Sequence, residues 1–101
     1  MNTATWQKYN LYQQLGNIGS EISRALSWEK SRNNENRQKA LERTLDLLDL
    51  TINDIRWKKK RKELLRLREV TSDQITNNIY NINLENLLNY CIDFAVLARG
   101  K

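Results

Sequence analysis

The sequence predicts an all-α fold, an antiparallel up-down four-helix bundle in which residues 1–101 form a single domain. The 101-residue chain has no proline and only three glycines, whereas hairpins and β-sandwiches need turn residues at short intervals. Three segments also repeat apolar residues at alternating spacings of four and three, and a fourth segment keeps its apolar residues on one helical face. This repeat is typical of helices that bury one face in a bundle.

The first predicted helix spans about residues 5–28, with Trp6 and Tyr9 at the margin of its buried face. Gly16 and Gly19 fall inside this helix, where each glycine costs about 1 kcal/mol relative to alanine. Either simple tolerance or the close approach of a neighbouring helix would explain them. The expected core positions of this helix are Leu11, Leu15, Ile18, Ile22 and Ala25.

A second helix is predicted over about residues 35–53, after a polar connection in which Asn33, Asn34 or Asn36 is the N-cap. Two further leucines lie off its apolar seam, which indicates that more than one face of this helix is covered. The expected seam residues are Leu41, Leu45, Leu48, Ile52 and Ile55.

The basic segment that follows is predicted to form a separate helix, over about residues 55–75. Continuing the previous apolar repeat would place Lys59 and Lys62 in the core, where unpaired lysines are rarely found. The later apolar residues share a face rotated by roughly 100° or more from the earlier seam. We therefore expect a turn near Asn53 and Asp54, with Asp54 as the N-cap. The new apolar face comprises Trp57, Leu64, Leu67 and Ile75.

The last predicted helix covers about residues 84–99, after an asparagine-rich connection over residues 77–83. Asn83 is expected to cap its start. Arg99 in the last turn and Gly100 beyond it are ordinary signals of a helix end. The expected core residues are Leu84, Leu88, Cys91, Ala95 and Ala98.

The residue types favour a non-catalytic protein without a cofactor or a resident metal. Histidine is absent, which removes the commonest general base and all triads and metal sites that need an imidazole. Cys91 is expected to be a structural thiol. Asp46 and Asp49, three residues apart, are more typical of a solvated face or of arginine partners than of a metal site.

The chain is expected to be cytoplasmic. A single cysteine cannot form an internal disulfide, which fits a reducing compartment. The first residues include no apolar run of signal-peptide length, and nowhere do 18 apolar residues follow one another. The sequence therefore predicts neither standard secretion nor a membrane-spanning helix.

The strongest functional signal is a concentration of positive charge. The chain carries a net charge of +5, and residues 55–72 hold eight basic and two acidic side chains. On a helical wheel, four of the cations project away from the apolar face and form a stripe about 12 Å long. These four are Lys58, Lys59, Lys62 and Arg66, while Lys60, Arg61 and Arg68 fall nearer the core edge.

This stripe predicts contacts with the phosphates of a nucleic acid. The candidate nucleic-acid-binding residues are Lys58, Lys59, Lys62, Arg66, Lys60 and Arg61. No aromatic residue interleaves with the stripe, so base stacking is not expected. A solvated face that only confers solubility remains an equal alternative. A membrane surface is disfavoured because the opposite, apolar face is needed for the core.

Three segments resemble small bacterial four-helix-bundle proteins: LGNIGSEISRA (Leu15 to Ala25), ALERTLDLLDLTI (Ala40 to Ile52) and KELLRLRE (Lys62 to Glu69). This superfamily includes the ribosomal intervening-sequence proteins and the accessory variability determinant (Avd) of diversity-generating retroelements. The resemblance implies a ring-shaped, pentameric homo-oligomer that binds RNA or DNA through basic side chains and docks onto a reverse transcriptase.

Two hypotheses follow. The first is an oligomeric nucleic-acid-binding accessory protein, an Avd-like partner of a reverse transcriptase. The second is a scaffold or adaptor bundle that binds only protein, with the basic helix serving solubility or an acidic partner.

Overall fold

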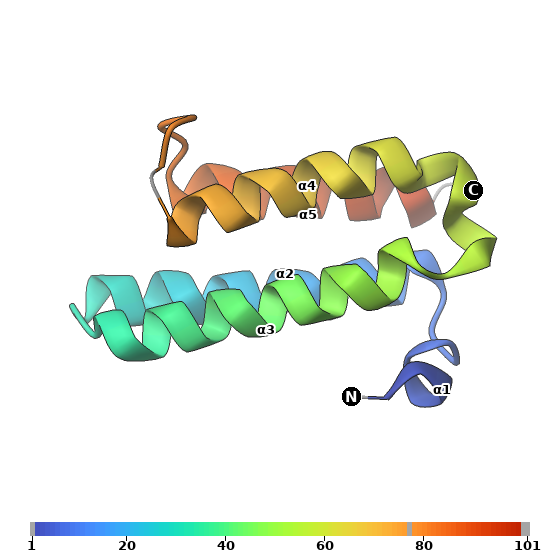
Figure 1. Cartoon of the computed structure of the whole chain (residues 1–101), viewed down its shortest axis with the longest axis horizontal. Helices are drawn as coiled ribbons and strands as arrows, with labels where there is room; N and C mark the ends of the chain where they lie inside the picture. The colour runs from blue at the N-terminus through green and yellow to red at the C-terminus, as the bar shows by residue number, and fades with distance from the viewer. Residues whose placement is uncertain (1, 77, 100–101) are drawn as a thin grey trace.

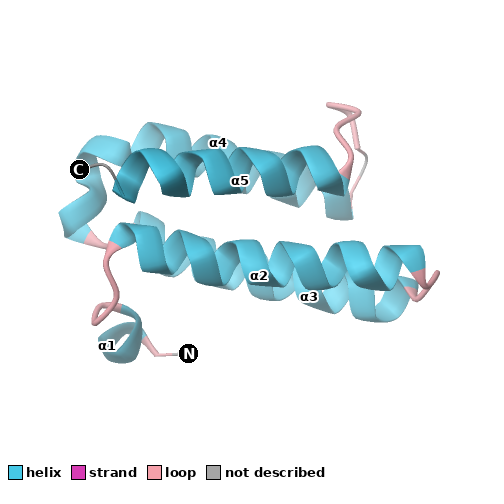
Figure 2. Cartoon of the chain, turned by 180° about the vertical axis from the view of Figure 1, so that it is seen from behind, coloured by secondary structure: helices cyan, strands magenta, loops and turns pink. Residues whose placement is uncertain are grey.

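A computed structural model describes residues 2–76 and 78–99, and every regular element in these residues is a helix (Figures 1 and 2). The all-α prediction is therefore confirmed. In chain order, the elements are α1 (Thr3–Trp6), α2 (Leu11–Lys30), α3 (Asn34–Ile52), the 3₁₀ helix η1 (Ile55–Lys60), α4 (Arg61–Ile75) and α5 (Leu84–Arg99).

The four longer helices lie lengthwise in two layers, with α2 and α3 in one and α4 and α5 in the other (Figure 1). The packed pairs are α2 with α3, α2 with α5, α3 with α4, and α4 with α5. The chain reverses direction between successive long helices, so the start of α2, the corner at η1 and the end of α5 lie at one end of the molecule (Figure 1). We call this end the basic end.

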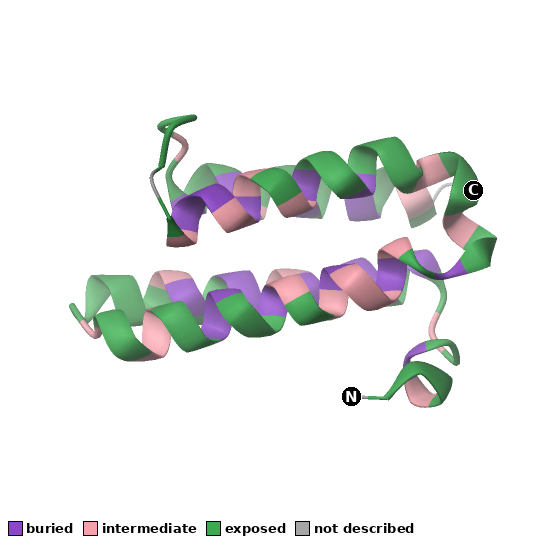
Figure 3. Cartoon of the chain, viewed as in Figure 1, coloured by how far each residue is buried: buried purple, intermediate pink, exposed green. Residues whose placement is uncertain are grey.

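The buried residues lie mainly on the sides of the helices that face the other layer (Figure 3). The predicted seam of α2 is buried at every position: Leu11, Leu15, Ile18, Ile22 and Ala25. On α5, Leu84, Cys91 and Ala95 are buried as expected, and Leu87 and Phe94 join them. None of the helices in the described ranges is both long and apolar enough to cross a bilayer.

The prediction of one continuous first helix is wrong, because Asn10 starts a new helix. Its backbone is extended, and its side chain accepts a hydrogen bond from the backbone N–H of Gln13 at 2.8 Å. The Gln13 side chain accepts in return from the backbone N–H of Asn10 at 2.9 Å. This reciprocal capping box satisfies donors that a helix start otherwise leaves unpaired. Residues before it form the separate, one-turn α1.

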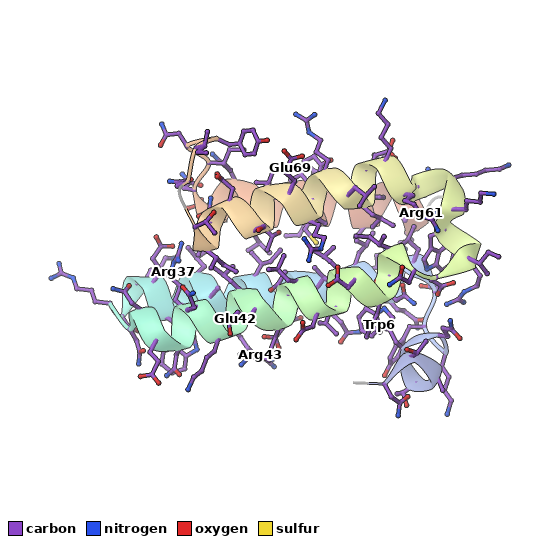
Figure 4. All side chains as sticks on the ribbon, in the orientation of Figure 1. Trp6, Arg37, Glu42, Arg43, Arg61 and Glu69 are labelled. Carbon is purple, nitrogen blue, oxygen red and sulfur yellow. The ribbon has the colours of Figure 1, made fainter. Side chains whose placement is uncertain are left out.

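Trp6 of α1 was expected at a seam margin, and it is fully buried. Its indole N–H donates to the Thr51 hydroxyl at 2.9 Å. Figure 4 places Trp6 between α1 and the C-terminal part of α3. The polar edge of the ring is satisfied inside the protein, so the whole side chain can leave water. The buried ring and its hydrogen bond hold α1 against α3.

The buried face of α3 differs from the predicted seam. Leu41 and Leu48 are buried, but Ile55 lies beyond the helix end and is 80% exposed. Two threonines, Thr44 and Thr51, are fully buried instead. Thr44 donates its hydroxyl to the carbonyl of the residue four positions earlier, at 2.8 Å. Local bonds of this kind allow threonine into a core, and hydrophobicity patterns do not reveal them.

The asparagine caps fall where the sequence placed them. Asn33 accepts from the backbone N–H of Asn36 at 3.0 Å, so it is the N-cap among the three candidates. Asn83 accepts from the N–H of Asn86 at 2.8 Å, as expected at the start of α5. The predicted connection 77–83 agrees over residues 78–83, and Asn77 lies outside the described residues.

Neither helical glycine is required by a close approach within the chain. A β-carbon at Gly16 would meet open space within 4 Å. At Gly19 it would lie 3.8 Å from the Cys91 sulfur and 3.9 Å from Leu88, which are ordinary contacts. Within one copy of the chain, the structure therefore favours simple tolerance of both glycines.

Candidate nucleic-acid interface

The basic segment begins at a sharp corner that Asp54 holds. The chain leaves α3 at Asn53, and Asp54 caps η1 by accepting from the backbone N–H of Arg56 at 3.1 Å. The predicted turn and its capping residue are confirmed. Asp54 is only 1% exposed, although it carries a carboxylate. A buried carboxylate needs partners that replace water, and the corner supplies them.

Arg56 is the main partner of this carboxylate. Its terminal nitrogen donates to Asp54 at 2.7 Å and to the backbone carbonyl of Tyr9 at 2.9 Å. These hydrogen bonds from the guanidinium lower the pKa of Asp54, and burial opposes the shift less strongly. The pair joins the corner to the segment between α1 and α2.

Gln14, fully buried on α2, completes the corner network. Its amide nitrogen donates to the Trp6 carbonyl at 3.1 Å and to Asp54 at 3.4 Å. Its amide oxygen accepts from the Trp57 indole at 3.0 Å. One glutamine therefore contacts α1, the corner and η1. A network of satisfied buried groups restricts their motion, so the network gives the basic segment a defined position.

The predicted single helix over residues 55–75 is wrong, because it consists of the 3₁₀ helix η1 followed by α4. Trp57, inside η1, has φ −106° and ψ 22°, and Lys60, just before α4, has φ −101° and ψ 3°, so neither residue has α-helical geometry. A 3₁₀ helix also advances by about 120° per residue, against 100° in an α-helix. The predicted continuous stripe is consequently divided. Lys58, Lys59 and Lys60 lie on η1, and Arg61, Lys62 and Arg66 lie on α4.

Burial sorts these six side chains differently from the helical wheel. Lys58, Lys59, Lys62 and Arg66 are exposed, as predicted, and Lys60 is half-buried, as expected near the core edge. Arg61 was also expected near the core edge, but it is exposed at the start of α4 (Figure 4). The wheel misplaced Arg61 because it extended α-helical geometry through η1.

The remaining basic residues of the segment have carboxylate partners inside the protein. Arg56 pairs with Asp54, and Arg68 donates to Asp49 at 2.6 Å across the α3–α4 contact. By contrast, among residues 2–76 and 78–99, none of the six candidate side chains has a carboxylate oxygen within 4 Å.

The segment therefore presents six positive charges that have no carboxylate partner within 4 Å in the described chain. Five lie at or next to the corner, whereas Arg66 lies further along α4, beside Asn86 and Tyr90. Glu63 and Glu69 of the same segment lower its net charge but pair with none of the six.

Part of this charge faces a cleft of about 610 Å³ at the basic end. Four cations line it, and no carboxylate belongs to its lining. The lining residues are Asn10, Leu11, Tyr12, Arg56, Trp57, Lys59, Lys60, Ala98 and Arg99. They come from the start of α2, from η1 and from the end of α5, which meet at this end (Figure 1). The cleft can hold an anion of nucleotide size.

Two aromatic rings in the cleft are covered by guanidinium groups. The guanidinium carbon of Arg56 lies 4.5 Å from the centroid of the Trp57 ring, and that of Arg99 lies 5.5 Å from the Tyr12 ring. Both distances suit cation–π attraction. The stripe itself contains no aromatic residue, as the sequence indicated, but the fold brings these two rings beside Lys59 and Lys60.

Sequence patterns missed Tyr12 and Arg99 because they lie far from the basic segment along the chain. The available signal was the predicted up-down order of the helices. That order brings the start of the first long helix, the start of the third and the end of the last to one end. This helix order, together with the positions of the charged residues in the sequence, would have identified both residues.

Two of the other candidate chemical groups, Cys91 and Asp49, lie in structural settings, and Asp46 is exposed. Cys91 is fully buried, and burial raises the pKa of its thiol to about 12, so the thiolate needed for nucleophilic attack is scarce. Asp49 serves as an arginine partner, which was one of its two expected roles. No group of three or more potential metal ligands occurs within the described ranges.

Comparisons of this chain with protein-family models, with curated proteins and with solved structures gave no match.

Proposed function

We propose that this protein is a non-catalytic nucleic-acid-binding protein that contacts phosphates through its basic end. The observation that carries the proposal is the set of six cations without carboxylate partners in the described chain, next to a cleft that is lined by cations and lacks acidic groups. Elsewhere on the described surface, Arg24, Lys39 and Arg43 are paired with glutamates. Other cations, such as Lys30 and Arg32, are exposed without a carboxylate partner among the described residues, but they do not form a cluster of six in one segment. Uncompensated positive charge at one end attracts a polyanion.

The test is a titration with a mixed-sequence RNA and a DNA duplex at several salt concentrations. About four phosphate contacts predict that log K falls with log salt with a slope near −3 to −4. Changing Lys58, Lys59, Lys62 and Arg66 to glutamine should abolish most of the binding and flatten this slope. No binding at low salt would leave the protein-only scaffold as the explanation. Binding that the variant does not weaken would show that the basic segment is not the contact surface.

A matched control distinguishes the effect of the basic segment on binding from the effect of the protein's net charge. Changing Arg24, Lys30, Arg32 and Lys39 to glutamine removes the same number of positive charges from exposed positions outside the basic segment. We expect this control to lose far less affinity than the variant of the basic segment. Equal losses in the two variants would mean that net charge, and not the basic end, governs binding.

We also propose that the four longer helices form an antiparallel up-down four-helix bundle. The reversals of the chain and the four packed helix pairs support this architecture. It can be tested at Gly19, where an added β-carbon would lie 3.8 Å from the Cys91 sulfur. If α2 packs against α5 in solution, Gly19→Cys should form an internal disulfide with Cys91 when the chain is refolded under oxidising conditions, because the thiol is accessible until folding buries it. Failure to form it during such refolding would argue against this packing.

Self-association is the third part of the proposal, with a second copy of this chain as the partner. A groove between α2 and α5 includes the exposed apolar residues Ile92 and Val96. The side chains that line it carry no charge, so two copies of a +5 protein can meet there without direct repulsion. From the resemblance to Avd, we also propose that the assembly is a pentameric ring and that it binds a reverse transcriptase.

Light scattering tests the assembly, and one pair of variants tests the surface. Ile92 and Leu65 are both 47% exposed, but only Ile92 lines the groove. Ile92→Glu should reduce the particle mass to that of a monomer, and Leu65→Glu should leave it unchanged. A wild-type monomer at micromolar concentration would refute self-association. Co-purification with a reverse transcriptase encoded by a neighbouring gene would test whether that enzyme is a partner.

A further inference from the structure

We infer that the cleft at the basic end accommodates an unpaired nucleotide, so that this protein prefers single-stranded over duplex nucleic acid. The inference rests on the proposed function and specifies its ligand. Its basis is the meeting of two guanidinium-covered aromatic rings with two lysines in one cleft.

The size and charge of the cleft suit one nucleotide. Sites for small organic ligands usually measure roughly 300–1,000 Å³, and this cleft measures about 610 Å³. Lys59 and Lys60 supply positive charge for phosphates, and Arg99 adds a third charge from the other wall. Arg56 contributes less charge, because Asp54 neutralises it.

The aromatic side chains provide surfaces for a base. Nucleobases stack on aromatic rings and on the planes of arginine guanidinium groups. Here a guanidinium lies over each ring, and a base would stack on the ring or on the guanidinium plane. The Arg56–Trp57 pair is held in place, because Arg56 is bonded to Asp54 and Tyr9 while the Trp57 indole donates to Gln14. A fixed stacking surface loses little conformational entropy on binding.

A duplex cannot use these surfaces. Its bases are stacked on one another, so their faces are not available to protein rings, whereas single strands expose them. Duplex nucleic acid would contact only the outer cations, including Lys58, Lys62 and Arg66. Single strands would contact these cations and also place a base in the cleft. The protein should therefore bind a single strand more tightly than a duplex when the same number of phosphates contacts the outer cations.

The test compares a labelled 12-nucleotide single strand with a 12-base-pair duplex by fluorescence anisotropy at low salt. Tyr12→Leu keeps an apolar side chain but removes the ring. Loss of one stacked base typically reduces affinity by about tenfold, so the variant should bind the single strand about tenfold more weakly and bind the duplex unchanged. Tyr12 also lines the α2–α5 groove proposed for self-association, whereas Arg99 lines only the cleft. Arg99→Gln leaves the Tyr12 ring in place and should show the same selective loss, which separates base stacking from a change in assembly.

Trp28→Leu is the matched control. Trp28 is 37% exposed and Tyr12 is 39% exposed, but Trp28 lies near the opposite end of α2. This variant should bind both probes like the wild type. In it, the only tryptophans are the fully buried Trp6 and the cleft residue Trp57. Quenching of its fluorescence by the unlabelled single strand would therefore report stacking near Trp57.

The possible outcomes separate this inference from the proposed function. If Tyr12→Leu and Arg99→Gln bind both probes like the wild type, or weaken both equally, the cleft does not hold a base and the inference is overturned. The loss of binding in the Lys58, Lys59, Lys62 and Arg66 variant would still support the proposed function. If neither probe binds to the wild type at low salt, both proposals fail.

Discussion

Replacing Arg56 by methionine should show how much the ion pair between Arg56 and Asp54 contributes to the free energy of unfolding. The Asp54 side chain is 2% exposed, and Arg56 gives it a charge-assisted hydrogen bond of 2.7 Å. Methionine keeps much of the aliphatic volume but removes every guanidinium donor. The carboxylate would retain only the Arg56 backbone N–H and a 3.4 Å bond from Gln14. The variant therefore leaves a buried charge with too few partners.

The expected cost lies between two limits. Removing one partner of a fully buried pair costs about 3–5 kcal/mol, and an exposed pair is worth about 0–1 kcal/mol. The Arg56 side chain is 40% exposed, so water can reach the edge of Asp54 once the guanidinium is absent. We expect a loss of about 2–3 kcal/mol in the free energy of unfolding at pH 7, measured by urea denaturation followed by circular dichroism.

The pH dependence gives a second, independent readout. Arg56 lowers the pKa of Asp54 below its usual 3.8, so in the folded wild type the carboxylate holds its proton less tightly than in the unfolded chain. This stabilisation is present above pH 3.8 and is lost as the pH falls through the lowered pKa. The difference between wild type and Arg56→Met should therefore be complete at pH 7 and shrink below about pH 3.8.

Arg61→Met is the control, because Arg61 is exposed and has no carboxylate within 4 Å in the described chain. It should change the free energy of unfolding by less than about 0.5 kcal/mol. The reasoning would be refuted if Arg56→Met cost no more than Arg61→Met. It would also be refuted if the difference between wild type and Arg56→Met grew as the pH fell below 3.8.

Three further predictions concern the helices. Gly16→Ala should raise the free energy of unfolding of the monomer by about 0.5–1 kcal/mol in urea denaturation, because the new β-carbon meets open space; a decrease would contradict this. Trp6→Phe should lower it by about 2 kcal/mol, because the buried indole loses volume and its bond to Thr51, whereas exposed Trp28→Phe should have little effect. Cys91, with its thiol pKa raised to about 12, should react with a thiol reagent at pH 8 only as fast as the protein unfolds; rapid labelling of the native state would show that the thiol is accessible.

The predicted helix limits agree best where a cap and a periodic apolar face coincide. The second and last helices were expected at 35–53 and 84–99, and they occur at Asn34–Ile52 and Leu84–Arg99. Asparagine caps and leucine repeats are local features, so the sequence displays them directly. The first and third predicted helices failed at their starts, at the capping box of Asn10 and at the non-helical Trp57.

Those two breaks are stabilised by partners far away in the chain. Trp6 is held by Thr51, and Trp57 by Gln14. Both hydrogen bonds join residues more than 40 positions apart in the chain, so a local sequence pattern cannot predict them. The buried polar residues Gln14 and Thr51 would also be read as surface positions on a hydrophobicity plot. Only the assembled corner provides the partners that make their burial favourable.

The sequence by itself determined that this protein is helical, where two of its long helices begin and end, and that its positive charge lies in residues 55–72. These are consequences of apolar periodicity, capping chemistry and composition, all of which act over a few residues. The tertiary structure decided how that charge is presented. It divided one predicted stripe between η1 and α4, gave Arg56 and Arg68 internal partners, and brought Tyr12 and Arg99 beside Lys59 and Lys60. The surroundings of a charge depend on which distant helix ends pack against it, and packing is a property of the whole fold.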